Sequence, residues 1–454
     1  MHSFEHFYFS DFIFVQKVQM KKSHVIARSP AESGATKPAA SPLGEQSPFF
    51  PPQKLADPPS ILAEARRLLR PSLCSGLAMT ASIIFATAIT AQNTAAYQPP
   101  VVRVAVIKDA QQLNLSIRSS FKIMPLEADE ILYEGGKLDS SLVEPTLWGV
   151  KIADMDFKVY GIRVISLTDS AIFINKRSFR GEVDIIRQGN KTLLVVNYIN
   201  VEDYLRGVLY MEVSHWWPMN TLKAQAIAAR TFALYQANLN KGKDYDLEST
   251  VYSQVYGGSA FERIRTNDAV YKTTGLVLTY NGQLFPAFYH ATCAGHTEDA
   301  STLWKTDLYP LKGVACNFCR QSPHFYWKRK IPVKDIENAL AIKDIQGITP
   351  KATNNSGRIV LLAINTHDKT IDVSAKDFRQ KLGSNLIKST IFKINIKPDS
   401  DGKLIAYIEG AGWGHGVGMC QWGAFGMALR NYKAEDILKY YYPGAEIQAY
   451  DGQK

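Results

Sequence analysis

Apolar and polar residues alternate over short stretches between about residues 100 and 200. The segments VVRVAVI, LNLSIRS and GVKIADMDFKVYGIRVISL follow this two-residue period, with turn residues between them. In an antiparallel sheet, such alternation turns one side of each strand toward the core and the other toward solvent. We therefore predict a β-rich region over residues 97–195, with a hairpin turn at RQGNKT (187–192).

After residue 200 the apolar residues recur at helical spacing. The stretch 201–213 predicts a helix with one face formed by Leu205, Val208, Leu209 and Glu212. Asn220 is a typical N-cap, and the segment TLKAQAIAARTFALYQANL (221–239) after it is rich in helix-forming residues. These two helices are expected to form the centre of a core region over residues 196–330.

The rest of the chain mixes both periods. Residues 331–400 contain short strand-like and helix-like segments and predict a small α/β insertion. Residues 401–454 begin with a strand-like segment and continue through the glycine-rich stretch GAGWGHGVGMCQWGAFG (410–426). The segment 433–447 then predicts a closing helix and a turn at Pro443-Gly444. The predicted fold class is mixed α+β and rich in β-strands.

An uncharged apolar segment, SLCSGLAMTASIIFATAITA (72–91), follows Arg66, Arg67 and Arg70. Basic residues before an apolar stretch that ends in small residues indicate a secretory signal over 71–96. Its length of about 20 residues would also allow an uncleaved membrane anchor. A buried core helix is the alternative. We expect an exported protein of the periplasm or cell envelope, either released or held in the inner membrane by residues 72–91. Residues 1–70 are expected to be disordered or a mis-assigned N-terminal extension.

The chain carries a formal net charge of +10. This charge suits polyanionic surroundings, which include nucleic acid, an anionic membrane face and an acidic cell wall. No block of lysine and arginine is dense enough to favour nucleic acid. We therefore expect no nucleic-acid partner.

Glu212 is the first candidate for chemistry. It ends the first predicted helix on its apolar side, and the residues Trp-Trp-Pro follow at 216–218. A carboxyl group against apolar surface has a raised pKa and can keep a proton near neutral pH, as a general acid must. The alternative is an ordinary helix carboxylate paired with Arg206 or Arg230.

Five segments in a fixed order resemble the SpoIID/LytB family. They are the VEDYL to ARTFAL series (201–234), YSQVYGG (252–258), TTGLVLTYNG (273–282), FYHATCAGHTED (288–299) and GWGHGVGMCQWGA (412–424). The resemblance implies a two-lobed fold with a central helix pair and a substrate cleft. It also implies a lytic transglycosylase that cleaves peptidoglycan glycan strands, preferably those without stem peptides, with Glu212 as the catalytic residue.

A lytic transglycosylase needs one carboxyl group. Hydrolytic glycosidases use two, whereas here the C6 hydroxyl of the sugar closes onto C1 and leaves a 1,6-anhydro-muramoyl end. No cofactor is needed for this chemistry. Glu202 and Asp203 lie at the start of the helix, where a capping or dipole role accounts for them.

Seven further residues are substrate-binding candidates: Gln225, Arg230, Gln254, Tyr256, His415, Gln421 and Trp422. Alternatives remain for several of them. Tyr256 can be the buried tyrosine of a tight loop, Arg230 can form a surface ion pair or orient Glu212, and His415 can be a structural histidine. The glycine-rich stretch lacks the lysine-serine or lysine-threonine ending of a phosphate-binding loop, and its glycines are expected to pack as one wall of the cleft.

Cysteine and histidine form a second constellation. Cys293-x2-His296 and Cys316-x2-Cys319 have the paired spacing of a structural zinc site, with His290 as an alternative ligand. A disulfide is the competing interpretation in an exported protein, and free thiols are the third. Cys420 lies outside this set and is expected to be a packed free thiol.

Two other functions remain open. A non-catalytic protein could grip glycan and present it to a cell-wall amidase, since some relatives are described as amidase enhancers. Zinc hydrolysis at the cysteine and histidine cluster would need an open coordination position, and four protein ligands argue against it.

Overall fold

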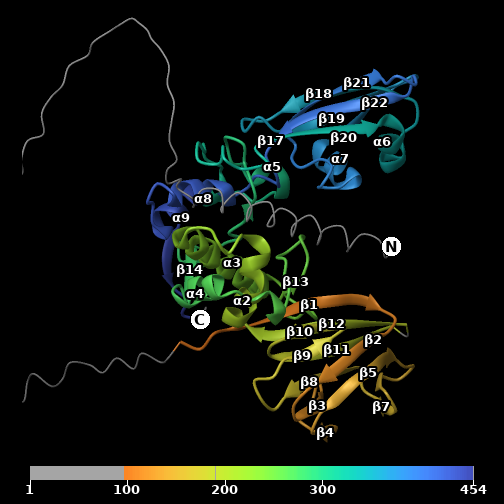
Figure 1. Ribbon diagram of the computed structural model, residues 1–454, viewed down its shortest axis with the longest axis vertical. Coiled ribbons are helices and arrows are strands. Elements are labelled where there is room, and N and C mark those ends of the chain that lie inside the picture. The colour runs from red at the N-terminus through yellow and green to blue at the C-terminus, as the bar shows by residue number, and fades with distance from the viewer. Residues whose placement is uncertain (1–96, 190, 453–454) are drawn as a thin grey trace, which may run out of the picture. The chain divides into compact units, whose positions relative to one another are not determined.

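The structure, a computed structural model, describes residues 97–189 and 191–452 (Figure 1). The predictions for residues 1–70 and 71–96 lie outside the described residues. Residues from Tyr97 onward form one compact unit. The predicted mixed α+β, β-rich class is confirmed. Within the described part, no helix combines the length and the apolarity that a membrane crossing requires.

Two sheets form the N-terminal region, and their strands pair antiparallel except for β13, which pairs parallel with β1. The larger one has the strand order β13-β1-β12-β11-β8-β3-β4 and the smaller one has the order β10-β9-β2-β5-β6-β7. The strands are β1 (Val101–Ala110), β2 (Leu113–Ile117), β3 (Phe121–Pro125), β4 (Tyr133–Gly135), β5 (Leu138–Pro145), β6 (Val150–Ile152), β7 (Met155–Phe157), β8 (Gly161–Ser166), β9 (Ile172–Ile174), β10 (Arg177–Phe179), β11 (Glu182–Gln188), β12 (Thr192–Asn200) and β13 (Leu247–Glu248).

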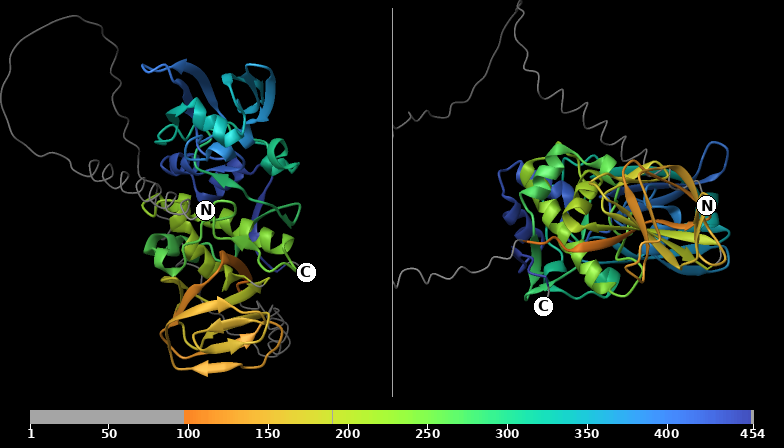
Figure 2. Two further views of the ribbon diagram at one scale, coloured as in Figure 1. Left: turned by 90° about the vertical axis from the view of Figure 1, so that its right-hand side faces the viewer. Right: turned by 90° about the horizontal axis from the view of Figure 1, so that it is seen from below.

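The alternation read from the sequence is realised in this region. In β2, Leu113, Leu115 and Ile117 are buried and the residues between them are not. Side chains from both sheets share one hydrophobic core. The ribbons of β1 to β12 run from orange to yellow-green in Figure 2. Strands β11 and β12 pair antiparallel, with Gln188 opposite Thr192, which confirms the predicted hairpin.

Helices α2 (Val201–Glu212) and α3 (Met219–Leu239) follow β12 directly and pack on each other (Figure 1). The side chain of Asn200 accepts a hydrogen bond of 2.9 Å from the Asp203 N–H and caps α2. The predicted N-cap of the second helix is wrong. That helix begins at Met219 after Pro218, and the Asn220 amide donates instead to the Tyr432 carbonyl at 3.1 Å. Proline fits here because the first N–H groups of a helix have no partner within it.

Short elements complete the region around the helix pair. They are η1 (Ser259–Phe261), α4 (Ile264–Tyr271), β14 (Leu276–Tyr280), β15 (Gln283–Leu284), β16 (Tyr289–His290), α5 (Ser301–Trp304), η2 (Tyr309–Leu311), β23 (Met419–Cys420), α8 (Gln421–Ala428), α9 (Ala434–Tyr441) and β24 (Glu446–Ala449). Helices α8 and α9 both contact α3. The C-terminal stretch therefore returns to the helix pair.

The segment from β17 to β22 has a hydrophobic core of its own. Strand β17 (Tyr326–Pro332) pairs along its whole length with β22 (Leu404–Ala411), so the segment begins and ends at the same place. We call residues 326–411 the inserted lobe. Between its end strands lie α6 (Val333–Leu340), β18 (Ile345–Thr353), β19 (Ile359–Thr366), β20 (Thr370–Ser374), α7 (Ala375–Leu382) and β21 (Phe392–Pro398).

Candidate active site and cysteine cluster

Glu212 is the last residue of α2, where its side chain is partly exposed. Its Oε1 accepts a hydrogen bond of 2.9 Å from the Val255 N–H, and the side chain of Gln421 also hydrogen-bonds to the carboxyl group. Burial raises the pKa of Glu212 to about 7, and the two hydrogen bonds oppose that rise. A carboxyl group with this pKa can donate a proton and take one back near neutral pH.

The loop that presents the Val255 N–H is held by Gln254. The Tyr204 hydroxyl donates to Gln254 Oε1 at 3.0 Å. Gln254 Nε2 donates to the Ala229 carbonyl at 3.1 Å and to the Tyr289 hydroxyl at 3.0 Å. Gln254 is fully buried, so its side chain positions the donor to Glu212 and has no surface for a substrate.

The glycine-rich stretch brings Gln421 to Glu212. Strand β23 pairs parallel with β16, with Tyr289 opposite Met419 and His290 opposite Cys420. The close approach of this stretch to the chain before β16 requires glycine. At Gly418, whose φ is +71°, a Cβ would lie 2.0 Å from the Phe288 carbonyl oxygen. Gln421 is buried at the start of α8, and its Nε2 donates at 3.4 Å to Gln225 Oε1 on α3.

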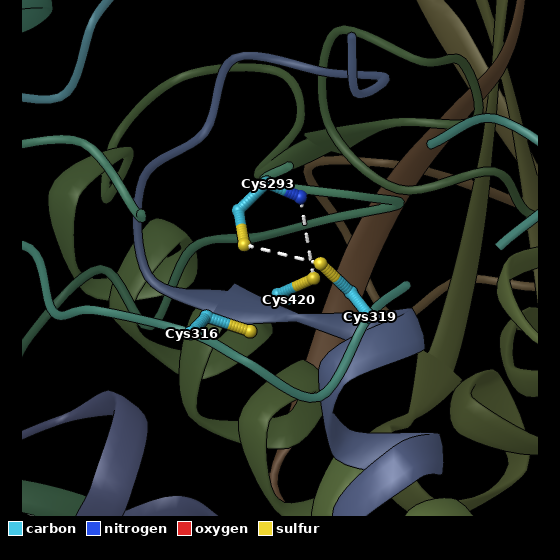
Figure 3. A group of neighbouring side chains, drawn as sticks. All are labelled: Cys293, Cys316, Cys319 and Cys420. Carbon is cyan, nitrogen blue, oxygen red and sulfur yellow. Dashed lines mark hydrogen bonds between the residues drawn. The ribbon is translucent and has the colours of Figure 1, made fainter. Parts of the chain in front are cut away.

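Four cysteines, one of them within the glycine-rich stretch, lie close together (Figure 3). The sulfur atoms of Cys293, Cys316, Cys319 and Cys420 are all within 4.8 Å of one another, and all four residues are buried. None of the described cysteines forms a disulfide. The Sγ of Cys420 accepts the N–H groups of Cys293 and Gly423, each at 3.3 Å.

The prediction that Cys420 lies outside the cysteine set is wrong, and Cys420 takes the place expected of His296. His296 Nδ1 lies 2.6 Å from the Thr297 carbonyl oxygen. His290 is outside the cluster as well. Its Nδ1 lies 3.1 Å from the Val417 carbonyl oxygen, and its Nε2 has no partner within the described residues. The four-sulfur cluster forms because the pairing of β16 with β23 joins segments about 130 residues apart.

Sequence comparison places this arrangement among known proteins. A family model described as "Stage II sporulation protein" (SpoIID) matches residues 189–280, and a domain of unknown function (DUF8618) matches residues 316–418. Stage II sporulation protein D of Bacillus subtilis is 31% identical over 286 residues, which cover 59% of this chain and 79% of that protein. The chain belongs to the SpoIID family.

Two other relatives extend this result. An uncharacterized protein of Brachyspira hyodysenteriae is 30% identical to this SpoIID protein over 357 residues, which cover 77% of this chain and 94% of the relative. A Bacillus subtilis protein named amidase enhancer is 28% identical over 300 residues, which cover 54% of this chain and 40% of that protein. The SpoIID family and the name amidase enhancer together support a role connected with the cell wall.

In this chain, Arg230 forms its ion pair with Glu202 and not with Glu212. It is fully buried and donates through Nε and Nη2 to both oxygens of Glu202, at 2.9 Å and 2.7 Å. Its Nη1 donates to the Leu276 carbonyl at 3.0 Å. The prediction of a substrate-binding Arg230 is therefore wrong. Glu202 is a partner in a buried ion pair rather than only a residue at a helix end.

We expect Arg230→Met to lower the free energy of unfolding by about 3–5 kcal/mol, because it leaves Glu202 buried without its counter-charge. Urea denaturation measures this change. The matched control is Arg206→Met, which removes a more exposed pair with Asp203 (2.9 Å) and should cost less than about 1 kcal/mol. Equal stability losses in the two variants would contradict the buried ion pair.

Tyr256 is also a structural residue. Only 2% of it is exposed, and its hydroxyl donates to Asn197 Oδ1 at 2.8 Å. Gly207 on α2 makes room for the ring, since a Cβ there would lie 2.5 Å from Tyr256 Cε2. The prediction that Tyr256 contacts substrate is wrong, and the alternative of a buried tyrosine in a tight loop describes it.

His415 holds the glycine-rich stretch through both ring nitrogens. Nδ1 accepts the Val417 N–H at 3.1 Å, and Nε2 lies 3.0 Å from the Tyr289 carbonyl oxygen, which assigns the neutral tautomer protonated at Nε2. Burial is the main cause that lowers the pKa of His415 to about 3. The structure thus supports the structural alternative for His415 and gives it no free nitrogen for a substrate.

Trp422 and Gln225 complete the set of predicted binding residues. The ring of Trp422 is partly exposed and packs edge-on against Trp217 and Phe425, with centroids 5.1 Å and 5.2 Å apart. Gln225 is fully buried, and its Nε2 has no partner in the described part of the chain. Of the seven candidates, Gln421 hydrogen-bonds to Glu212 and Gln225 reaches that group through Gln421.

Proposed function

We propose that this SpoIID protein is a lytic transglycosylase that cleaves peptidoglycan glycan strands, preferably strands without stem peptides. The observation that carries the proposal is a single, partly exposed carboxyl group, Glu212, whose pKa is about 7. A group of this kind can protonate a leaving oxygen and then act as a base at the same pH.

In the proposed reaction the Glu212 carboxyl donates its proton to the glycosidic oxygen while the bond from that oxygen to C1 breaks. The Val255 N–H and the Gln421 side chain stabilise the carboxylate that remains. That carboxylate takes the proton of the C6 hydroxyl as O6 bonds to C1. A 1,6-anhydro-muramoyl end forms, Glu212 returns to its acid form and no water is consumed.

The nearby carboxylates fit this one-carboxyl scheme. Glu202 is bound to Arg230 in a buried ion pair, and Asp203 is bound to Arg206 at 2.9 Å. Both lie in the first turn of α2, whereas Glu212 is at its end. A hydrolase would need a second carboxylate facing the sugar, and neither of these two is available for that role.

For the four-cysteine cluster we propose a structural zinc ion. Sulfur atoms around a tetrahedral zinc, with Zn–S of about 2.3 Å, lie about 3.8 Å apart. The Cys293–Cys319 sulfur distance of 3.6 Å and the 4.8 Å limit for the whole group fit that geometry. Zinc bound by four protein thiolates has no open position. It would contribute stability and leave the chemistry to Glu212.

We further propose that the protein works in the cell envelope. The segment 72–91 would export the chain, and would hold it in the inner membrane if it is not cleaved. The net positive charge of +10 suits an anionic wall.

The relative named amidase enhancer favours a second candidate, in which the protein binds glycan and presents it to a cell-wall amidase without cleaving it. One experiment separates the two. Purified protein and its Glu212→Gln variant are incubated with glycan strands without stem peptides, and the products are analysed by mass spectrometry. The enzyme produces anhydro-muramoyl ends and the variant does not. If neither protein produces these ends while both bind the strands, the binding function holds instead.

A further inference from the structure

We infer that Arg358 is the buried counter-cation of the metal-loaded cysteine cluster and thereby joins the inserted lobe to it. The inference rests on the proposed metal, and it assigns to the lobe a part in holding that metal. Arg358 lies in the loop between β18 and β19, directly before Ile359.

Arg358 is buried, and the acceptors of its hydrogen bonds are neutral groups. Its exposed fraction is 2%. Nη2 donates to the Cys293 carbonyl at 3.3 Å, and Nη1 donates to the His296 carbonyl and the Ser356 hydroxyl, both at 3.2 Å. Its Nε has no hydrogen-bond partner in the described part of the chain. A buried cation is costly unless negative charge lies nearby.

Two cysteines of the cluster supply that negative charge when they are thiolates. Burial lowers the pKa of the Arg358 guanidinium, and the negative groups that oppose this effect are Glu298, Cys293 and Cys420. The Glu298 carboxylate has the largest effect of the three, and it also accepts hydrogen bonds from the Asn354 amide at 2.6 Å and the Ser356 hydroxyl at 2.8 Å. The thiolates would add to the negative charge that Glu298 supplies.

The glycine-rich stretch is shaped around the guanidinium. At Gly416, whose φ is +93°, a Cβ would lie 2.5 Å from Arg358 Cζ and Nη2. Gly416 is four residues before Cys420. The same stretch thus makes room for the cation and supplies one of the four sulfur ligands.

The charges of the metal-loaded cluster and of Arg358 explain why the two lie together. Four thiolates with one divalent ion carry a net charge of −2, which is costly to bury without a nearby cation. Without the metal, protonated thiols add no negative charge to that of Glu298. Metal binding and the Arg358 charge must therefore stabilise each other to the same extent, because such coupling is reciprocal.

The test measures cobalt(II) binding to the full-length protein under reducing conditions, followed by the thiolate-to-cobalt absorption bands. Competition with a chelator gives the affinity, and melting temperatures are recorded with and without metal. We expect one cobalt per cluster in the wild type. Arg358→Met should lower the affinity about 10- to 100-fold, the usual effect of an outer-shell change, and Arg358→Lys should have a smaller effect.

Arg329→Met is the matched control. Arg329 lies in the same lobe and its guanidinium also donates to two carbonyl groups, those of Lys328 and Asn385. It should bind cobalt as the wild type does. Wild-type affinity in Arg358→Met, or no cobalt bands in the wild type, would overturn the inference.

If Arg358→Met does not fold, Arg358→Lys decides the question. The inference requires that metal raises the melting temperature of Arg358→Lys less than that of the wild type. An equal rise in the two proteins would overturn the inference. None of these measurements uses glycan. A failed cleavage assay therefore bears on the proposed glycan cleavage alone. A failed metal assay bears on the proposed zinc and on this inference, and leaves the proposed cleavage as it stands.

Discussion

Replacing Glu212 with glutamine is expected to lower the rate of glycan cleavage by about 10²- to 10⁴-fold, the usual contribution of a general acid and base. Glutamine keeps the shape of the side chain but carries no transferable proton. In the wild type, cleavage should slow as the pH rises above about 7, because the first step needs the protonated acid. Anhydro-muramoyl ends, counted by mass spectrometry across pH, measure both effects.

The same variant should be more stable than the wild type above pH 7. The pKa of Glu212 is raised from 4.5 in the unfolded chain to about 7 in the folded protein, so the folded protein binds the proton more tightly. Wild-type stability therefore falls as the pH rises between these two values. Glutamine avoids this loss, which amounts to up to about 3 kcal/mol.

Urea denaturation at pH 4 and pH 8 tests this expectation. Glu202→Gln is the control, because it removes charge from a carboxylate that is bound to Arg230 and should destabilise the protein. If Glu212→Gln has the same stability relative to the wild type at both pH values, the raised pKa is not present in the folded protein.

Replacing Cys420 with serine is expected to abolish stoichiometric zinc binding and to remove the stability linked to it. For a site held at about a thousand times its Kd, that stability is about 4 kcal/mol. The Cys420 sulfur also caps α8 by accepting the Gly423 N–H. Serine is a preferred N-cap residue, so the variant keeps the cap and loses only the thiolate.

His296→Ala is the matched comparison, because the spacing of Cys293 and His296 would make His296 a ligand whereas the fold places Cys420 there. Metal content per chain and thermal unfolding should be unchanged in this variant. If His296→Ala loses zinc and Cys420→Ser keeps it, the ligand set of the cluster has been assigned wrongly.

Local patterns in the sequence were sufficient for most helices and strands and for the position of Glu212, whose catalytic role stays a prediction. Alternation predicts the strands, and apolar residues at helical spacing place Glu212 at the end of the first helix. The prediction that Cys420 lies outside the cysteine set failed. Spacing arguments apply to residues near one another in the chain, and Cys420 reaches Cys293 only through the register of two short strands.

The charged and aromatic candidates failed because burial is a property of the whole fold. Arg230 could bind a substrate or a carboxylate, and nothing within its own helix tells which. The answer depends on Glu202, which lies 28 residues away and faces the same interior. Tyr256 and His415 likewise find their partners in segments distant in sequence, Asn197 and Tyr289.

The short parallel pairing of β16 with β23 also bears on when the protein can become active. Glu212 lies before the middle of the chain, whereas Gln421 is near its end. Contacts between such distant segments form late, since the loop between them must close first. A growing chain would therefore carry Glu212 through most of synthesis without the Gln421 amide that faces it. Any product that stops short of α8 should lack the proposed cleavage activity, however well its first sheets have folded.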